Sequence, residues 1–377
     1  MTIETKTPLL GGLSPEQFMR KHWQKKPLLV RQAFPGVVPP ATRAELAELA
    51  ASEATESRLI THFDGRWTMK QGPVAKLPPF SKAGWTLLVQ GLDLQVEAAH
   101  AMLQRFNFLP AARLDDLMIS YASDGGGVGP HFDSYDVFLI QVAGRRRWRI
   151  GAQKDAVMRD DVPLKIIANF EPGEEFLLEP GDMLYLPPGW AHDGVAEGGD
   201  CMTCSVGFRA PGRLELAREL LARLLDDAED AEDSGYADRI YADPKQAATA
   251  QAGLVPIDLQ IFARDAAERA LRQPLALERA LGETLTEPKP RVWFDIGDPL
   301  PEGCGARLDP RTRMLYDAAH VFINGESFRA SGRDAKLMQG LADTRELSAA
   351  DVERLSDGAR ELLMQWTEDG WLQPLMP

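Results

Sequence analysis

The segment that spans residues 125–141 places an imidazole and a carboxylate two positions apart, in His131-Phe132-Asp133. The sequence predicts that this tripeptide begins a strand, in which alternation puts residues 131 and 133 on the same face. Two such side chains can bind one metal ion at about 2 Å each. Because a His-x-Asp pair is common by chance, a third ligand is needed before it indicates a metal site.

A second histidine follows a turn with little backbone freedom. Residues 181–192 read Gly-Asp-Met-Leu-Tyr-Leu-Pro-Pro-Gly-Trp-Ala-His, which predicts a strand, a tight Pro/Gly turn, and His192 at the start of the next strand. This is the spacing of the second cupin motif. Together, His131, Asp133 and His192 would form a two-histidine, one-carboxylate facial triad with coordination positions left open for a co-substrate and dioxygen. The alternatives are a surface histidine at 131, a structural histidine at 192, or a degenerate cupin that binds no metal.

An arginine-rich stretch, residues 144–149, follows the His-x-Asp pair on what we expect to be the next strand. A buried guanidinium at Arg146 could bind the distal carboxylate of a dicarboxylate co-substrate through two parallel hydrogen bonds. The alternative is a basic edge strand whose arginines are all solvated. We expect solvation for Arg145 and Arg147, and the sequence leaves Arg149 open.

The elements that would position these residues are mostly short strands. Ser14-Pro15 predicts the start of a helix, and Asp64-Gly65 predicts a hairpin turn between strands at 58–63 and 66–70. A helix is expected at 94–106. Further strands are expected at 85–90, 117–121, 137–142, 147–150, 176–178, 183–186 and 202–208. Many short strands separated by Gly/Pro turns favour a mainly β barrel or sandwich.

The pattern changes after Pro211-Gly212. Helices are predicted at 214–225, 257–271 and 275–281, and the acidic run 226–233 reads as a solvated linker. The last part mixes helices with a hairpin signal, Asn324-Gly325, as in a small α+β module of winged-helix type. We therefore expect three parts, at 1–210, 211–287 and 288–377.

Composition excludes several classes of protein. No apolar run approaches the roughly 20 residues that cross a bilayer, and the first residues do not resemble a secretory signal. Three cysteines in 377 residues give no disulfide framework, which is typical of a cytoplasmic protein. A net charge of −14 argues against direct nucleic-acid binding and favours basic partners.

These motifs resemble the JmjC subfamily of 2-oxoglutarate oxygenases. The N-terminal pattern from Phe18 through Trp23 to Arg31 is similar to the opening of the ribosomal oxygenases. The run 125–151, with its His-x-Asp and Gly-Arg-Arg-Arg-Trp-Arg segments, resembles their bacterial branch, the ribosomal oxygenase A type. The resemblance covers the whole chain in layout, and its most specific motifs lie in residues 18–31 and 117–192.

The resemblance implies a double-stranded β-helix (a cupin or JmjC barrel), a helical dimerisation segment and a C-terminal winged helix. It implies Fe(II) at His131, Asp133 and His192, with 2-oxoglutarate held by Arg146 and contacted by Ser120. Such an enzyme uses O2 to convert 2-oxoglutarate to succinate and carbon dioxide while it hydroxylates a C–H bond. It would act as a homodimer on an arginine of a basic large-subunit ribosomal protein.

Substrate contacts are predicted at Tyr135 and Asp124. Tyr135 shares the inward phase of His131 and Asp133, and Asp124 lies on the Gly-rich loop before them. Packing for Tyr135 and turn formation for Asp124 are the alternatives. Two other functions stay open: a histidyl hydroxylase or N-methyl-lysine demethylase with the same iron site, and an interaction protein that has lost its metal.

Overall fold

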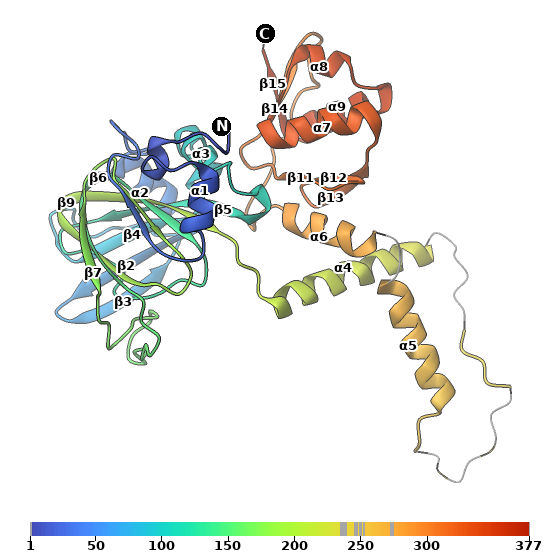
Figure 1. Cartoon of the computed structure of the whole chain (residues 1–377), viewed down its shortest axis with the longest axis horizontal. Coiled ribbons are helices and arrows are strands. Elements are labelled where there is room, and N and C mark those ends of the chain that lie inside the picture. Colours follow the sequence, from blue (N-terminus) through green and yellow to red (C-terminus); the bar gives the residue numbers. More distant parts are fainter. Residues whose placement is uncertain are drawn as a thin grey trace. The chain divides into compact units, whose positions relative to one another are not determined.

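The computed structural model describes residues 2–376, apart from 234–239, 245–247, 249–250, 252 and 272–274. The chain divides into two compact units, one of Met1–Ala210 with Arg291–Trp293 and the other of Pro211–Pro290 with Phe294–Pro377 (Figure 1). None of the helices in these described ranges combines the length and the apolar character that crossing a bilayer requires.

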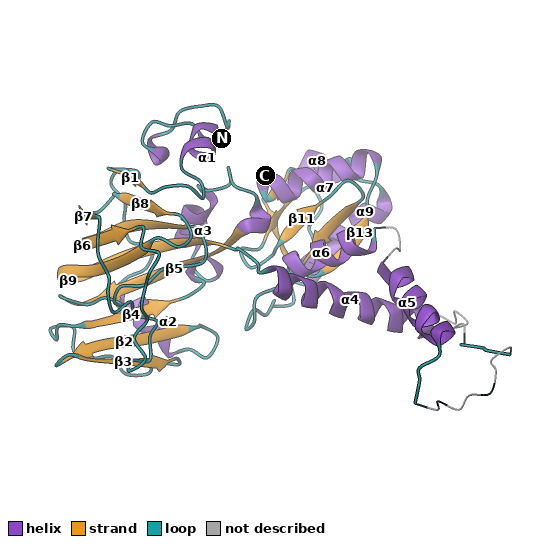
Figure 2. Ribbon diagram, turned by 60° about the horizontal axis from the view of Figure 1, so that its bottom comes forward, coloured by secondary structure: helices purple, strands orange, loops and turns teal. Residues whose placement is uncertain are grey.

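The first unit is built on one antiparallel sheet of nine strands, ordered β1-β8-β6-β9-β5-β4-β2-β3, with β7 paired to β6 (Figure 2). This confirms the prediction of a mainly β fold. The strands are β1 (Leu28–Val30), β2 (Ser57–Phe63), β3 (Arg66–Gln71), β4 (Trp85–Val89), β5 (Leu114–Ala122), β6 (Val137–Gly151), β7 (Glu174–Leu178), β8 (Met183–Leu186) and β9 (Ala191–Phe208). Its helices are α1 (Pro15–Lys21), α2 (Arg43–Ala51) and α3 (Glu97–Gln104), with short 3-10 turns at Pro8–Leu10, Leu92–Leu94 and Ala111–Arg113.

Local sequence signals account for the ends of several elements. Ser14 and Gln17 form a capping box at α1, with Gln17 N donating to Ser14 Oγ at 3.2 Å and Ser14 N donating to Gln17 Oε1 at 3.1 Å. Asp64 and Gly65 have φ of 50° and 73°, the left-handed pair that a two-residue hairpin turn requires. The helix and the hairpin predicted at these positions are confirmed.

The long strands β6 and β9 pair along almost their whole length, from Val137↔Gly207 to Gly151↔Ala191. The sequence predicted two strands in place of β6, and this was wrong. Gly144, at φ 60°, marks an irregularity in the middle of β6, where an added Cβ would lie 2.9 Å from the backbone of Asp200 and Cys201. The glycine lets the strand continue through a bulge, and a bulge changes which side chains face inward.

One face of this sheet carries the main core. Buried side chains from the N-terminal elements pack on it, among them Phe18, Leu46 and Leu103. The opposite face carries a smaller cluster that includes Leu139, Trp148 and Ile150. His192 and Arg146 lie beside this second cluster, 5.8 Å and 5.7 Å from the Trp148 ring.

The second unit contains helices and two small sheets, β14-β10-β15 and β11-β12-β13. Its helices are α4 (Arg213–Asp233), α5 (Ile257–Leu271), α6 (Ala276–Thr286), α7 (Gly332–Thr344), α8 (Ala349–Glu353) and α9 (Asp357–Glu368). Its strands are β10 (Gly305–Leu308), β11 (Met314–Tyr316), β12 (His320–Ile323), β13 (Glu326–Arg329), β14 (Glu346–Leu347) and β15 (Leu372–Leu375). The predicted hairpin at Asn324-Gly325 joins β12 to β13 and is confirmed.

The acidic run 226–233 was predicted as a linker, and this was wrong in secondary structure, because α4 continues through Asp233. Leucines at helical spacing before the run favour a helix, and acidic residues are themselves compatible with its continuation. The side chains of 226–233 lie outside the described residues.

A close approach between α6 and β12 provides a test of packing in the second unit. A Cβ at Gly282 would lie 2.4 Å from the ring of Phe322, so we expect Gly282→Ala to destabilise the chain by roughly 1–3 kcal/mol. Gly340→Ala on α7 is the matched control, since nothing lies within 4 Å of the added methyl, and it should be neutral or stabilise by about 0.5–1 kcal/mol. Urea unfolding midpoints would measure both changes, and equal effects would contradict this account of the α6–β12 contact.

Candidate metal centre

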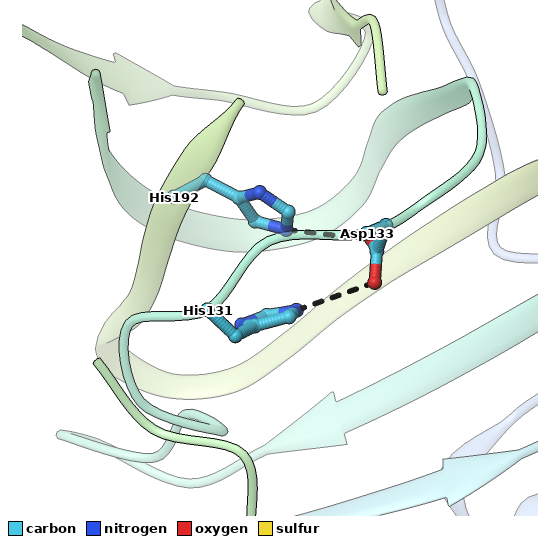
Figure 3. Close-up of side chains that lie close together, drawn as sticks. All are labelled: His131, Asp133 and His192. Atoms are coloured by element: carbon cyan, nitrogen blue, oxygen red, sulfur yellow. Dashed lines mark ion pairs between the residues drawn. The ribbon is translucent and has the colours of Figure 1, made fainter. Parts of the chain in front are cut away.

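Three side chains converge beside the smaller cluster of the first unit: His131, Asp133 and His192 (Figure 3). Their nearest ligand atoms all lie within 4.8 Å of one another. His131 Nε2 is 4.0 Å from Asp133 Oδ1, and His192 Nε2 is 3.7 Å from Asp133 Oδ2. The two imidazole centroids are 4.2 Å apart. The structure therefore brings together the three residues that the sequence predicted as ligands.

Backbone hydrogen bonds between the two histidines create this convergence. His131 N donates to His192 O at 2.9 Å, and His192 N donates to His131 O at 2.7 Å. The prediction that Asp133 lies on a strand was wrong: the His131–His192 pairing is an isolated bridge, and β6 begins only at Val137. Asp133 lies in a loop and is held instead by Gly189 N, from the Pro/Gly turn, which donates to Asp133 O at 2.8 Å.

Each imidazole is oriented by a second hydrogen bond. His131 Nδ1 donates to Gly129 O and His192 Nδ1 donates to Trp190 O, both at 2.9 Å. A proton on Nδ1 leaves the Nε2 lone pair free, and both Nε2 atoms face the Asp133 carboxylate. Nδ1 contacts of this kind orient metal-ligating histidines.

The electrostatics of the site suit a cation. Burial, reinforced by His131, lowers the pKa of His192 to about 3, so this imidazole is neutral near pH 7, as a metal ligand must be. Burial raises the pKa of Asp133, opposed by His131, Tyr135 and Arg58. A divalent ion would favour the ionised carboxylate. Two imidazoles and one carboxylate with open positions are the donor set of non-haem Fe(II) oxygenases, so these residues fit that metal.

Arg146 is the inward-facing arginine of the basic stretch. It lies on β6 and not on a separate following strand, and only 3% of it is exposed, whereas Arg145 is exposed. Its guanidinium makes long contacts, with Nη1 donating to Gly194 O and Nη2 to Ser120 Oγ, each at 3.5 Å. Its Nε has no hydrogen-bond partner, and no ion pair links it to a described carboxylate. A buried cation without an anion is costly, so the geometry favours an anionic ligand.

The neighbouring arginines are paired on the outer face. Arg147 pairs with Glu175 and Glu197, and Arg149 pairs with Asp193. Arg147 keeps 39% of its side chain exposed and so lies at the surface, as expected, but it also forms ion pairs that the sequence did not show. Ser120 is 6% exposed on β5, and its hydroxyl donates to Thr203 O at 3.3 Å while it accepts from Arg146.

Trp148 and Gly194 belong to the site but escaped the sequence reasoning. The indole of Trp148 lies 5.8 Å from the His192 ring, centroid to centroid. A Cβ at Gly194 would lie 2.6 Å from that indole, so glycine is needed for the contact. A glycine inside a strand is a signal of close approach, and it could have identified this position.

The two predicted substrate contacts lie in different places. Tyr135 is 40% exposed, and burial together with the Asp133 carboxylate raises the pKa of its phenol. Asp124 is not part of the ligand group. Its Oδ1 accepts from Gly198 N at 2.8 Å. Gly198 lies on β9, further along the strand than His192 and Ala196. This bond spans 74 positions in the sequence, so it is a tertiary contact that occupies one of the two carboxylate oxygens and not part of a local turn.

Asp116 is a carboxylate near Tyr135 that the sequence reasoning missed. Only 3% of it is exposed, and its charge contributes to the raised pKa of Tyr135 after burial and Asp133. Asp116 Oδ2 accepts from Gln90 Nε2 at 2.9 Å and from Gly91 N at 3.0 Å. A lone aspartate early in a strand carries no sequence signal for this placement.

Comparisons with known proteins fit this geometry. A JmjC domain model matches residues 101–216, and a ROXA-like winged-helix model matches residues 267–373. The chain is 37% identical over 346 residues to the ribosomal protein uL16 3-hydroxylase of Escherichia coli, covering 88% of this chain and 89% of that protein. It is 39% identical over 206 residues to a probable ribosomal oxygenase of Haemophilus influenzae, covering 53% of this chain and 50% of that protein.

A solved structure shows the same layout. The crystal structure of E. coli ycfD superposes with a TM-score of 0.82 at 31% identity and covers 96% of this chain and 98% of that one. Another structure of that protein holds cobalt and 2-oxoglutarate, and it matches with a TM-score of 0.79 at 31% identity over the same shares of both chains. The predicted JmjC and winged-helix fold is confirmed.

The ligand set predicts the behaviour of single variants. His131→Ala, Asp133→Ala and His192→Ala should each lose stoichiometric Fe(II), because the two remaining ligands cannot hold the facial geometry. Anaerobic calorimetry and metal analysis would measure the loss. His62→Ala is the control, since His62 stacks on Trp67 outside the ligand group and should keep wild-type occupancy. A ligand variant that binds iron like the wild type would refute this ligand set.

Proposed function

The chain belongs to the ribosomal oxygenase family of JmjC proteins, and we propose that it hydroxylates an arginine side chain of ribosomal protein uL16. It is an Fe(II)- and 2-oxoglutarate-dependent oxygenase. The observation that carries the proposal is the convergence of His131, Asp133 and His192 in a chain that matches a uL16 3-hydroxylase over most of its length.

His131, Asp133 and His192 would hold the iron, and Arg146 would bind the distal carboxylate of 2-oxoglutarate with Ser120 beside it. When bound, the metal, 2-oxoglutarate and O2 supply the oxidising power to hydroxylate a C–H bond, with succinate and carbon dioxide as products. The contribution of this chain is to orient the ligands and exclude water. Burial of Arg146 supports its role, since charge-assisted hydrogen bonds strengthen where water is absent.

An arginine substrate needs its guanidinium satisfied beside the metal, because an unpaired buried charge is costly. Tyr135 is the proposed local contact, supported by its 40% exposure on the loop that carries Asp133. Asp124 stays a predicted contact through its remaining carboxylate oxygen. The net charge of −14 supplies long-range attraction for a basic ribosomal protein.

Residues 1–210 are the proposed catalytic domain, 211–287 a helical dimerisation segment and 288–377 a winged-helix domain without direct nucleic-acid contacts. Exposed apolar side chains on α4 and α5 support a homodimer: Leu214, Leu221, Leu225, Ile257 and Ile261. Sedimentation, which separates a 41.6 kDa chain from its dimer, tests this assembly. The proposed ribosomal substrate supports a cytoplasmic location, which we propose with it.

The co-substrate assignment is tested by neighbouring arginines. Arg146→Ala should raise the requirement for 2-oxoglutarate by about 30- to 1,000-fold, which corresponds to roughly 2–4 kcal/mol for a charge-assisted bidentate contact. Arg145→Ala is the matched control on the exposed side of β6 and should change little. The KM for 2-oxoglutarate measures both, and similar losses in the two variants would contradict the assignment.

The substrate assignment is tested with peptides. Incubation with Fe(II), 2-oxoglutarate and a uL16 peptide should add about 16 Da to arginine, and lysine in its place should be a poor substrate. Rising salt should raise the KM for the peptide, as exposed charges are screened. Hydroxylation of histidine peptides alone, or demethylation of N-methyl-lysine, would overturn the proposed substrate and leave the iron site standing.

A further inference from the structure

The N-terminal motif that contains Phe18 and Trp23 packs against Tyr185, a residue of β8 outside the ligand group. The Tyr185 ring lies 4.9 Å from Phe18 and 6.0 Å from Trp23, centroid to centroid, and it is fully buried. Phe138 lies 4.9 Å from it on another side. Aromatic neighbours on several sides hold the Tyr185 hydroxyl in one orientation.

That hydroxyl donates to Asp136, three positions after Asp133. Asp136 is fully buried, and its Oδ1 accepts from Tyr185 Oη at 2.6 Å. Its Oδ2 accepts from Gln24 Nε2 at 3.0 Å and from Arg113 Nη2 at 3.5 Å. Its backbone carbonyl accepts from Phe208 N at 3.0 Å. A carboxylate with partners on both oxygens is a rigid anchor.

The loop that ends at Asp136 carries the carboxylate ligand. Between the His131 bridge and the start of β6 at Val137, no ladder pairing holds the loop. Its backbone is held at Asp133 by Gly189 N and at Asp136 by Phe208 N. Ser134 and Tyr135, between these two points, are exposed. The direction of the Asp133 carboxylate therefore depends on anchors on either side of it.

Gln24 completes the anchor. Its backbone has φ 54°, and its N–H donates to Tyr185 Oη at 2.8 Å while its side chain donates to Asp136. Left-handed backbone in a residue other than glycine is costly and persists where surrounding contacts impose it. The Tyr185 hydroxyl thus accepts from Gln24 and donates to Asp136, which links the N-terminal motif to the metal-binding loop.

We propose that Tyr185, Gln24 and Asp136 are positioning residues of the metal centre. They hold the loop so that the Asp133 carboxylate faces both histidines and the Tyr135 ring lies beside it. The inference rests on the metal-binding part of the proposed function and not on the identity of the substrate. Groups that orient metal ligands typically contribute about 10- to 100-fold in metal affinity.

Tyr185→Phe tests the anchor, and Tyr121→Phe is its matched control. Tyr121 is also buried and donates its hydroxyl to an aspartate, Asp200, at 2.7 Å, but it lies on β5 away from the metal-binding loop. Tyr185→Phe loses two hydrogen bonds, with Gln24 N and with the buried Asp136, whereas Tyr121→Phe loses one, to an aspartate whose side chain is 62% exposed. Tyr185→Phe should therefore lower the unfolding midpoint of the metal-free protein more than Tyr121→Phe, and Fe(II) affinity is the readout that separates positioning from stability. Anaerobic titration with Fe(II) should show affinity about 10- to 100-fold weaker for Tyr185→Phe and nearly unchanged for Tyr121→Phe.

Gln24→Gly provides a second variant that is compatible with the fold. Glycine suits φ 54° and keeps the N–H that donates to Tyr185, while the amide contact with Asp136 is lost. Its Fe(II) affinity should fall by several-fold. Wild-type affinity in both Tyr185→Phe and Gln24→Gly would overturn the inference, as would equal losses in Tyr185→Phe and Tyr121→Phe. Because the readout is metal affinity, a chain that binds iron but modifies no ribosomal protein would overturn only the proposed substrate.

Discussion

The two backbone hydrogen bonds between His131 and His192 are the constraint on which the metal centre depends. They join segments far apart in the sequence and set the two imidazoles 4.2 Å apart. Each ring then donates its Nδ1 proton to a carbonyl two residues earlier, so both Nε2 atoms face Asp133. A ligand set held in this way needs little reorganisation to bind an ion, which favours a high affinity.

The pairing of β6 with β9 positions the co-substrate side of the centre. His192 lies opposite Ile150, and Arg146 lies opposite Ala196 on the same strand pair, so the ligand and the cation share one rigid support. Gly144 allows the irregularity between Ala143 and Arg145. Side chains of β6 that face the smaller cluster are odd-numbered before Gly144, as at Leu139, and even-numbered after Gly144, as at Trp148. That change of phase is why Arg146 is buried and Arg145 is exposed.

One face of the sheet forms the stable core and the other carries the metal centre, and the metal-binding loop connects the two faces. The face toward the N-terminal helices is apolar and closely packed, with Phe18 and Phe138 in its core. The other face keeps polar groups buried, and Arg146 has few partners there. Such groups are costly unless a ligand satisfies them, so a site of this kind requires a stable core on the opposite face. Tyr185 contributes to both, with its ring in the core and its hydroxyl on Asp136.

The sequence by itself determined the identities of the three proposed ligands, the mainly β fold, the hairpin at Asp64-Gly65 and the family, because local turn chemistry and motif spacing carry those signals. It did not show that Asp133 lies in a loop, that Arg147 and Arg149 form ion pairs, or that Asp116 lies near Tyr135. Only the tertiary structure decided these points. Each depends on the register between strands that are distant in the chain, and a single bulge such as that at Gly144 reverses the face of every residue after it.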